Sequence, residues 1–155
     1  MGLGLGYLPI PGTFGSLASS AVFALLFYFL ERVVLQYAYL FLLIALLLLA
    51  FWSTEHALRR WQVEDPQVVV IDEVAGQWLA YGALVLPGIE YPAGTGWKYL
   101  LAGFILFRAL DTMKPFPIRR SEHLPGAAGV VVDDLIAAMY SGLALRGLNW
   151  TGWLQ

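Results

Sequence analysis

Long apolar segments separated by short polar turns dominate this chain of 155 residues. The strongest is Val33–Trp52, with 20 residues and no formal charge. A helix rises about 1.5 Å per residue, so this segment is long enough for a hydrocarbon core of about 30 Å. Leu17–Leu30 is shorter and reaches a sufficient length only if its helix begins near Thr13. Three weaker apolar segments follow, which are Val74–Ile89, Lys98–Met113 and Val130–Leu148.

These segments predict an all-α protein, a polytopic helical integral membrane bundle with four to five membrane segments in a single domain, residues 1–155. The number is open because Val74–Ile89 contains glycines and a proline, and it either crosses the bilayer or re-enters partway. Composition agrees, since 59% of the residues are hydrophobic and only 13% are charged, against about 25% in soluble domains. The first residues lack a basic segment, so we expect no cleavable signal peptide.

The polar segments differ in charge, and this predicts an orientation. Those after the second and fourth apolar segments hold Arg59, Arg60, Lys114, Arg119 and Arg120, whereas the opposite loops hold Arg32 and Lys98. The positive-inside rule then places the first group in the cytoplasm together with the N-terminus. We expect Ser53–Pro66 to be a water-exposed helix end followed by a turn at Asp65–Pro66. Val68–Ile71 is β-branched and either extended or the lead into the next helix, and Lys114–Gly129 is expected to be a loop.

Charge and cysteine content exclude several classes of function. The net charge of −2, with nine Lys and Arg in small groups, excludes a general nucleic-acid binder. The chain has no cysteine, which excludes disulfides, thiolate metal sites and cysteine nucleophiles. The oligomeric state stays open.

Four unusual motifs meet at the predicted cytoplasmic face. PGTFGS (residues 11–16) opens the first helix, and VIDEVAG (70–76) opens the third. FRALDTMKPFPIRR (107–120) closes the fourth helix, and VVVDDLIAA (130–138) opens the fifth. Their convergence is a stronger indication of a site than any one motif.

The acidic residues of these motifs are the candidate catalytic residues, namely Asp72, Glu73, Asp111, Asp133 and Asp134. A carboxylate in or beside a membrane segment is costly and is a functional candidate by default. The acidic pairs would repel one another unless a cation neutralised them, and oxygen ligands suit Mg²⁺. We therefore expect Mg²⁺ as a cofactor, with both pairs, Asp72–Glu73 and Asp133–Asp134, as ligands. The simpler alternative is that the acids only cap helix N-termini.

Basic and hydroxyl groups of the same motifs are candidates for binding a substrate phosphate. They are Thr13, Ser16, Arg108, Lys114 and Arg119. Guanidinium and ammonium groups match phosphate oxygens, and the backbone N–H groups at a helix start can hold a phosphate. PGTFGS is equally well explained as a turn in which Thr13 or Ser16 is an N-cap.

The alternative for the cations is contact with anionic lipid. We assign it to Arg59, Arg60 and one of Arg119 and Arg120. His56 lies outside the converging motifs, and His123 is better explained as a solvated loop histidine than as a general acid.

Four sequences, taken in order and with their spacing, carry a family resemblance. They are PGTFGS, DPQVVVIDEVAGQW (Asp65–Trp78), FRALDTMKPFPIRR (Phe107–Arg120) and GAAGVVVDDLIAA (Gly126–Ala138). Together they resemble the phosphatidylglycerophosphatase A family, over a match from about Gly4 to Ala138. The combination is specific, whereas an acidic pair alone is not.

This resemblance implies a multi-pass enzyme of the bacterial cytoplasmic (inner) membrane with its site facing the cytoplasm. Such an enzyme removes the terminal phosphate of phosphatidylglycerophosphate with Mg²⁺, giving phosphatidylglycerol and inorganic phosphate, the last step in making an anionic phospholipid. The resemblance assigns the five carboxylates to the acidic positions of the family, and Arg108 and Lys114 to its basic ones. The partner is then a phospholipid substrate, and the nucleophile is either water or an aspartate.

A rival function is a small transporter or channel with an ion site at the membrane midplane, which would also explain buried acids and glycines. It predicts acids near the middle of the apolar segments. Here they lie at segment ends on one predicted face, which favours the enzyme.

Overall fold

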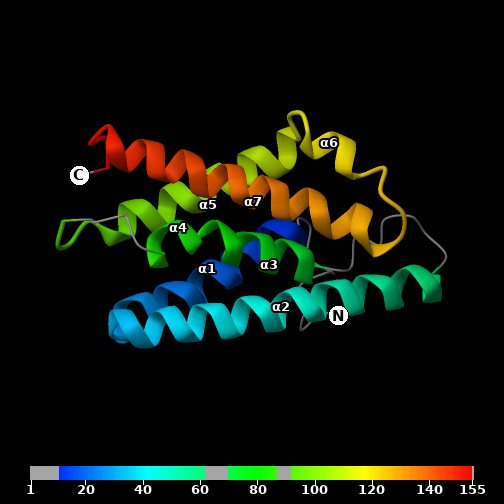
Figure 1. Cartoon of the computed structure of the whole chain (residues 1–155), viewed down its shortest axis with the longest axis horizontal. Coiled ribbons are helices and arrows are strands. Elements are labelled where there is room, and N and C mark those ends of the chain that lie inside the picture. Colours follow the sequence, from blue (N-terminus) through cyan, green and yellow to red (C-terminus); the bar gives the residue numbers. More distant parts are fainter. Residues whose placement is uncertain (1–10, 62–69, 87–91, 155) are drawn as a thin grey trace.

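The computed structural model describes residues 11–61, 70–86 and 92–154, and every regular element in these ranges is helical. The helices are α1 (Pro11–Phe29), α2 (Arg32–Trp61), α3 (Ile71–Ala80), α4 (Gly82–Val85), α5 (Gly96–Met113), α6 (Ile118–Ser121) and α7 (Ala127–Trp150). The predicted all-α bundle is confirmed, and Figure 1 shows its long helices lying lengthwise beside one another.

Three helices of the described chain are long and apolar enough to cross a membrane. They are Pro11–Phe29, Arg32–Arg60 and Ala127–Trp150, fewer than the four to five segments expected from the sequence. Helix α3 has 10 residues, about 15 Å, because the helix is interrupted at Tyr81 before α4 begins. Helix α5 has 18 residues but carries Lys98, Arg108 and Asp111.

The outer surface of the bundle is apolar in the way that a lipid environment favours. Phe29 is 82% exposed, Phe41 73% and Leu48 68%. Large exposed apolar surfaces of this kind mark contact with membrane or protein, and the long helices of α1 and α2 keep their backbone hydrogen bonds within the segment, as lipid requires.

Helix α3 lies at the centre of the bundle and contacts α1, α2, α5 and α7. A cluster of aromatic rings holds it there. Trp78 stacks on Tyr39 of α2, with ring centroids 6.1 Å apart, and meets Phe23 of α1 edge-on at 5.4 Å. The Trp78 indole N–H also donates to the Tyr39 carbonyl, at 3.2 Å. Because indole and phenol groups are bonded as well as packed, the cluster fixes the rotation of α3.

The polar segments between the helices agree only in part with the structure predicted for them. The turn at Glu31 separates α1 from α2, and α2 continues through the polar stretch to Trp61. The segment Lys114–Gly129 is not simply a loop, since it contains α6 and the first residues of α7. The expected turn at Asp65–Pro66, residues 68–69 of the expected extended segment and residues 87–89 of the third apolar segment lie outside the described residues.

Glycine lets α3 approach α5 and α7 closely. A Cβ added at Gly76 would lie 2.7 Å from the Phe107 ring and 3.2 Å from Cβ of Asp134. Phe107 is fully buried, so its ring has little room to move. A side chain at this position would therefore push apart the helices that carry the acidic motifs.

We expect Gly76→Ala to lower the free energy of unfolding by about 1–3 kcal/mol, the usual effect of overpacking a core. Gly147→Ala on α7 is the matched control, because nothing lies within 4 Å of its added Cβ. Its stability should be unchanged or higher, since alanine favours a helix over glycine. Unfolding in one detergent measures both, and equal losses in the two variants would contradict the packing argument.

Candidate active site

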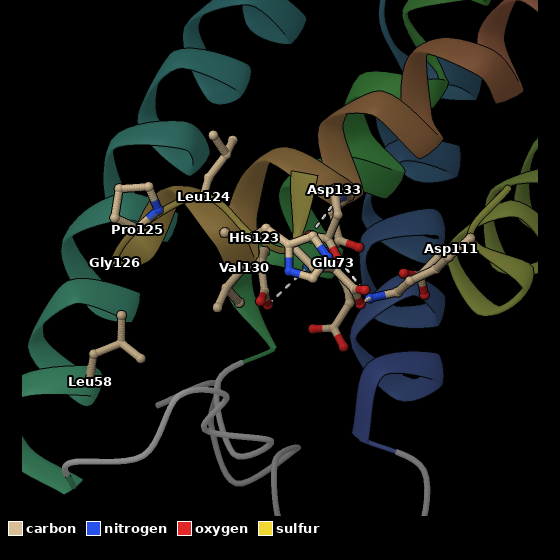
Figure 2. Close-up of a pocket in the computed structure, with 14 residues that line it drawn as sticks. Leu58, Glu73, Asp111, His123, Leu124, Pro125, Gly126, Val130 and Asp133 are labelled. Carbon is tan, nitrogen blue, oxygen red and sulfur yellow. Dashed lines mark hydrogen bonds and ion pairs between the residues drawn. The ribbon is translucent and has the colours of Figure 1, made fainter. Parts of the chain in front are cut away.

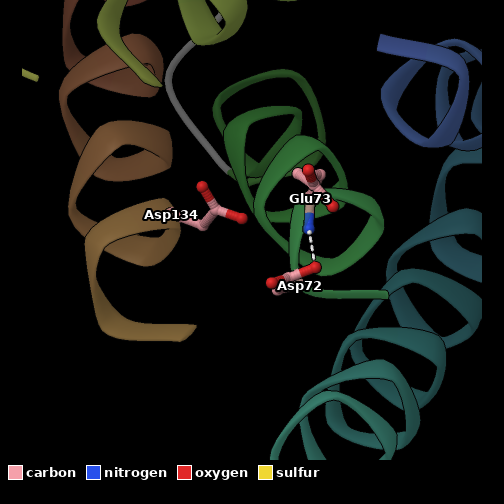
Figure 3. Close-up of side chains that lie close together, drawn as sticks. All are labelled: Asp72, Glu73 and Asp134. Atoms are coloured by element: carbon pink, nitrogen blue, oxygen red, sulfur yellow. Dashed lines mark hydrogen bonds between the residues drawn. The ribbon is translucent and has the colours of Figure 1, made fainter. Parts of the chain in front are cut away.

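Three carboxylates meet where α3 begins. Asp72 and Glu73 lie in the first turn of α3, and Asp134 reaches them from α7. One oxygen of each lies within 4.8 Å of one oxygen of the others. Figure 3 shows Asp134 pointing across to the two acids of α3. Asp72 and Asp134 are 5% and 4% exposed, so these charges are held away from water. We call Asp72, Glu73 and Asp134 the acidic trio.

The two acidic pairs of the sequence share one local geometry. The Glu73 backbone N–H donates to Oδ1 of Asp72 at 3.1 Å, and the Asp134 N–H donates to Oδ1 of Asp133 at 3.0 Å. In each pair, the backbone N–H of the second residue therefore orients the side chain of the first. Asp133 and Asp134 lie in the second turn of α7 rather than opening the helix as expected, because α7 begins at Ala127. Helix capping does not explain them, and neither α3 nor α7 has a side-chain hydrogen bond at its N-cap.

Lys114 binds two acids beside the trio. Its Nζ donates to Oδ2 of Asp133 at 2.6 Å and to Oε1 of Glu122 at 2.7 Å. Burial alone would lower the pKa of Lys114, but the hydrogen bonds and charges of Asp133 and Glu122 outweigh it and raise the pKa. Lys114 is therefore a fixed positive charge. It ends α5 with a left-handed backbone, φ 42°, which costs a non-glycine residue about 1–2 kcal/mol.

Arg108 and Asp111 form a second ion pair one turn earlier on α5. Nη1 of Arg108 lies 2.8 Å from Oδ2 of Asp111. The same Nη1 lies 3.5 Å from Oγ of Ser16, so the pair reaches the start of α1. A Cβ added at Gly12 would collide with the Glu73 carboxylate and come within 3.3 Å of Arg108. The ends of the Glu73 and Arg108 side chains would have to shift to admit a larger residue at position 12.

A cavity of about 740 Å³ opens over these groups. Six of the predicted site residues line it, namely Asp72, Glu73, Asp111, Lys114, Asp133 and Asp134. Leu58 and the segment His123–Gly126 also line it, and Figure 2 shows Leu58, Pro125 and Gly126 on the side away from Asp111. A volume of this size is typical of small-ligand sites. The structure thus gathers the five predicted carboxylates at one opening.

Other predicted residues lie outside the described lining of the cavity. Arg108 is paired with Asp111 but does not itself line the cavity, and Ser16 is fully buried beside Arg108. Thr13 is half-buried on α1, and Arg119 is exposed on α6. Their roles in binding phosphate stay predictions.

Two acids in the structure have roles that the sequence analysis does not assign. Glu122 lines the cavity and shares Lys114 with Asp133. In the sequence, Glu122 could have been noticed as the acid that follows a basic segment. Oε2 of Glu55 accepts a long hydrogen bond, 3.4 Å, from the Ala127 N–H. This places a negative charge at the start of α7, where the helix dipole favours it.

The site has more acidic than basic side chains, so its negative charges are not all neutralised by ion pairs. Arg108 pairs with Asp111, and Lys114 pairs with Asp133. Among the described residues, no ion pair joins the acidic trio to a cation, although Arg108 is close enough to Glu73 to attract its charge. Asp134 is close enough to Asp72, Glu73 and Asp111 for their charges to repel it. Such a site attracts a divalent cation or a proton.

We expect a strong energetic coupling between Lys114 and Asp133. In a double-mutant cycle of Lys114→Met and Asp133→Asn, the coupling free energy should be about 1.5–3 kcal/mol, as for hydrogen bonds to charged groups. The control is Arg59→Met with Glu55→Gln, since that ion pair is 79% and 43% exposed and solvent screens it. Unfolding in detergent measures both cycles. A Lys114–Asp133 coupling no larger than that of the exposed pair would contradict the assignment.

Comparison with known proteins places the chain among lipid phosphatases. Residues 1–149 match the family described as Phosphatidylglycerophosphatase A. The chain is 32% identical to a Bacteroides thetaiotaomicron protein named "Putative phosphatidylinositol-3-phosphatase", over 96% of this chain and 90% of that one. It is 31% identical to proteins named Phosphatidylglycerophosphatase A from Escherichia coli, over 97% and 82% of the two chains, and from Haemophilus influenzae, over 97% and 86%. No solved structure matches. The chain belongs to the phosphatidylglycerophosphatase A family and is a phosphatase of membrane lipids.

Proposed function

We propose that this protein is a Mg²⁺-dependent phosphatase that hydrolyses phosphatidylglycerophosphate to phosphatidylglycerol and inorganic phosphate. One observation carries the proposal. The acidic trio, two pairs of cation and carboxylate, and a cavity of about 740 Å³ lie together at one end of an apolar bundle. The names of the *Escherichia coli* and *Haemophilus influenzae* relatives support the substrate.

The acidic trio fits Mg²⁺ by its chemistry. All of its donors are carboxylate oxygens, which Mg²⁺ prefers, together with waters and substrate phosphate. Oε2 of Glu73 is buried and has no hydrogen-bond partner among the described residues, so the protein alone leaves this carboxylate incompletely satisfied. Asp72, Glu73 and Asp134 would hold the ion. Asp133, which the sequence analysis also proposed as a ligand, is bonded to Lys114 instead.

Hydrolysis joins a water oxygen to phosphorus and breaks the bond from phosphorus to the glycerol oxygen, which leaves as the alcohol after taking a proton. When bound, Mg²⁺ supplies positive charge that offsets the charges of the phosphate and the carboxylates. Lys114 lines the cavity and would stabilise the charge on the phosphate oxygens, while Arg108 holds Asp111 in place. A carboxylate of the cavity would take the proton from the attacking water. Attack by an aspartate, with later hydrolysis of the phosphoenzyme, is the other route.

A phospholipid substrate suits the position of the cavity. The acyl chains would lie along the apolar outer faces of the helices, while the headgroup reaches the acidic end. We propose that this end faces the cytoplasm of a bacterial inner membrane. Arg59, Arg60, Lys114, Arg119 and Arg120 gather there, at the ends of α2 and α5 and on α6. The reaction would complete the synthesis of an anionic phospholipid.

The *Bacteroides thetaiotaomicron* relative favours a second substrate, phosphatidylinositol 3-phosphate. Both lipids carry a phosphomonoester on a polyol headgroup, so one site chemistry serves either. The two substrates are compared directly in the assay below. A transporter with a midplane ion site is disfavoured, because the cavity lies at the ends of helices rather than at their middle.

The purified protein in detergent should release phosphate from phosphatidylglycerophosphate with Mg²⁺, and release should stop with EDTA. Asp72→Asn, Glu73→Gln and Asp134→Asn should each lower kcat/KM by at least about 100-fold, because a metal ligand is lost. Glu31→Gln is the control, since Glu31 is exposed in the turn at the opposite end of the bundle. Full activity in EDTA would refute the metal, and faster turnover of phosphatidylinositol 3-phosphate would change the substrate.

The proposed orientation has its own test, made simple by the absence of cysteine. We expect Arg120→Cys, on α6 at the site end, to react with a membrane-impermeant thiol reagent only after the inner membrane of spheroplasts is opened. Ala93→Cys, exposed in the turn before α5, should react in intact spheroplasts. The reverse pattern would place the site on the outer side, and reaction of both in intact cells would refute a membrane-spanning bundle.

A further inference from the structure

Gln77 is a buried polar residue that has no role in the site described above. It lies on α3, one turn after Glu73, and its side chain is fully buried. Neither Nε2 nor Oε1 of its amide has a hydrogen-bond partner among the described residues. An amide offers two donors and an acceptor, and burying them unpaired costs free energy. A glutamine buried in this position therefore points to a partner beyond its protein contacts.

Glu73 presents the matching acceptor. Its Oε2 is also buried and without a partner among the described residues. Residues four apart lie on the same face of a helix, with their Cβ atoms about 5–6 Å apart. The adjoining faces of α3 are occupied, since Gly76 packs against Phe107 and Trp78 packs against Tyr39. An unpaired donor and an unpaired acceptor thus share one face of α3, with Glu73 at the cavity and Gln77 one turn deeper.

We propose that Gln77 is a positioning residue for the metal site, through one buried water that accepts a hydrogen bond from its amide N–H and donates one to Oε2 of Glu73, since the two side chains form no direct hydrogen bond. The proposal rests on the function proposed above, in which Glu73 holds Mg²⁺. A carboxylate that binds a metal is usually oriented by a hydrogen bond to its other oxygen. Gly12 of α1 and the guanidinium of Arg108 also approach the Glu73 carboxylate closely. Gln77 would complete this support from inside the bundle.

A structural role and a positioning role predict different outcomes for Gln77→Met, which keeps the length of the side chain and removes its polar atoms. If Gln77 only filled space, the variant would bind Mg²⁺ as the wild type does. If Gln77 orients Glu73, Mg²⁺ binding weakens by about 10–100-fold, as when other outer-shell partners of metal ligands are lost. Without metal, Gln77→Met should lose little stability, because its amide makes no direct hydrogen bond to the described residues.

Gln36→Met is a matched control for the chemistry of the substitution. Gln36 lies in the first turns of α2, at the opposite end of the bundle, and its Nε2 donates to the Val85 carbonyl at 3.1 Å. This variant loses a hydrogen bond that is present in the structure, so it should lose stability and keep its Mg²⁺ affinity. Gln77→Met should therefore show the larger loss of Mg²⁺ affinity, and Gln36→Met the larger loss of stability.

The experiment titrates Mg²⁺ into detergent-purified, EDTA-treated wild type, Gln77→Met and Gln36→Met. It follows the melting temperature without substrate and, separately, phosphate release from phosphatidylglycerophosphate. We expect the half-saturating Mg²⁺ concentration of Gln77→Met to rise at least about 10-fold in both measurements, with kcat at saturating Mg²⁺ within a few-fold of wild type. Should Gln77→Met not fold, Gln77→Asn keeps the amide on a shorter arm and must show the same rise.

The outcomes separate the two proposals. An unchanged half-saturating concentration in a folded Gln77 variant overturns the positioning role and leaves the metal site intact. A wild type whose melting temperature and activity do not respond to Mg²⁺ overturns the metal site, and the role of Gln77 with it. A rise in Gln36→Met as large as that in Gln77→Met would show a general loss of structure and would also refute the inference.

Discussion

Three carboxyl groups held close together between α3 and α7, two of them buried, impose the main constraint on this structure. Asp72, Glu73 and Asp134 approach within bonding reach of one cation, and their repulsion has to be offset if the helices are to stay packed. The neighbouring cations form ion pairs with other acids, Arg108 with Asp111 and Lys114 with Asp133. Such a cluster favours the uptake of a cation or a proton, and binding of a divalent cation there is the basis of the proposed phosphatase site.

The rest of the fold can be understood as support for that cluster. Helix α3 is short and central, and its rotation is set by the aromatic cluster of Trp78, Tyr39 and Phe23. Glycines at positions 12 and 76 let α1, α5 and α7 approach the acids. The strained backbone of Lys114 ends α5 where its ammonium group reaches Asp133. A rigid apolar scaffold thus holds charged groups whose electrostatic energies would otherwise separate them.

The placement of the site at one end of the bundle also fits a reaction on a lipid headgroup. The apolar faces of the long helices suit the acyl chains, whereas the cavity and the basic residues share the end formed by α2, α5 and α6. Phosphate and carboxylates can then meet at the membrane boundary, where water is available for hydrolysis. A transport pathway would need polar groups through the middle of the bundle. There, the described core around Phe23, Tyr81 and Leu145 is mainly aromatic and aliphatic, with Gln77 and a few hydroxyls as its buried polar groups.

The sequence by itself determined the all-helical class, the apolar segments and the acids that meet in the cavity, because hydrophobic length and charge placement act locally along the chain. The described residues hold fewer candidate spanning helices than expected, because α3 ends at Ala80 and α5 carries Lys98, Arg108 and Asp111. Only the tertiary structure decided which carboxylate has which partner. Asp133 and Asp134 are neighbours in sequence, yet one binds Lys114 and the other faces α3. Successive residues of a helix point about 100° apart, so their different partners follow from how the helices pack and not from their order in the chain.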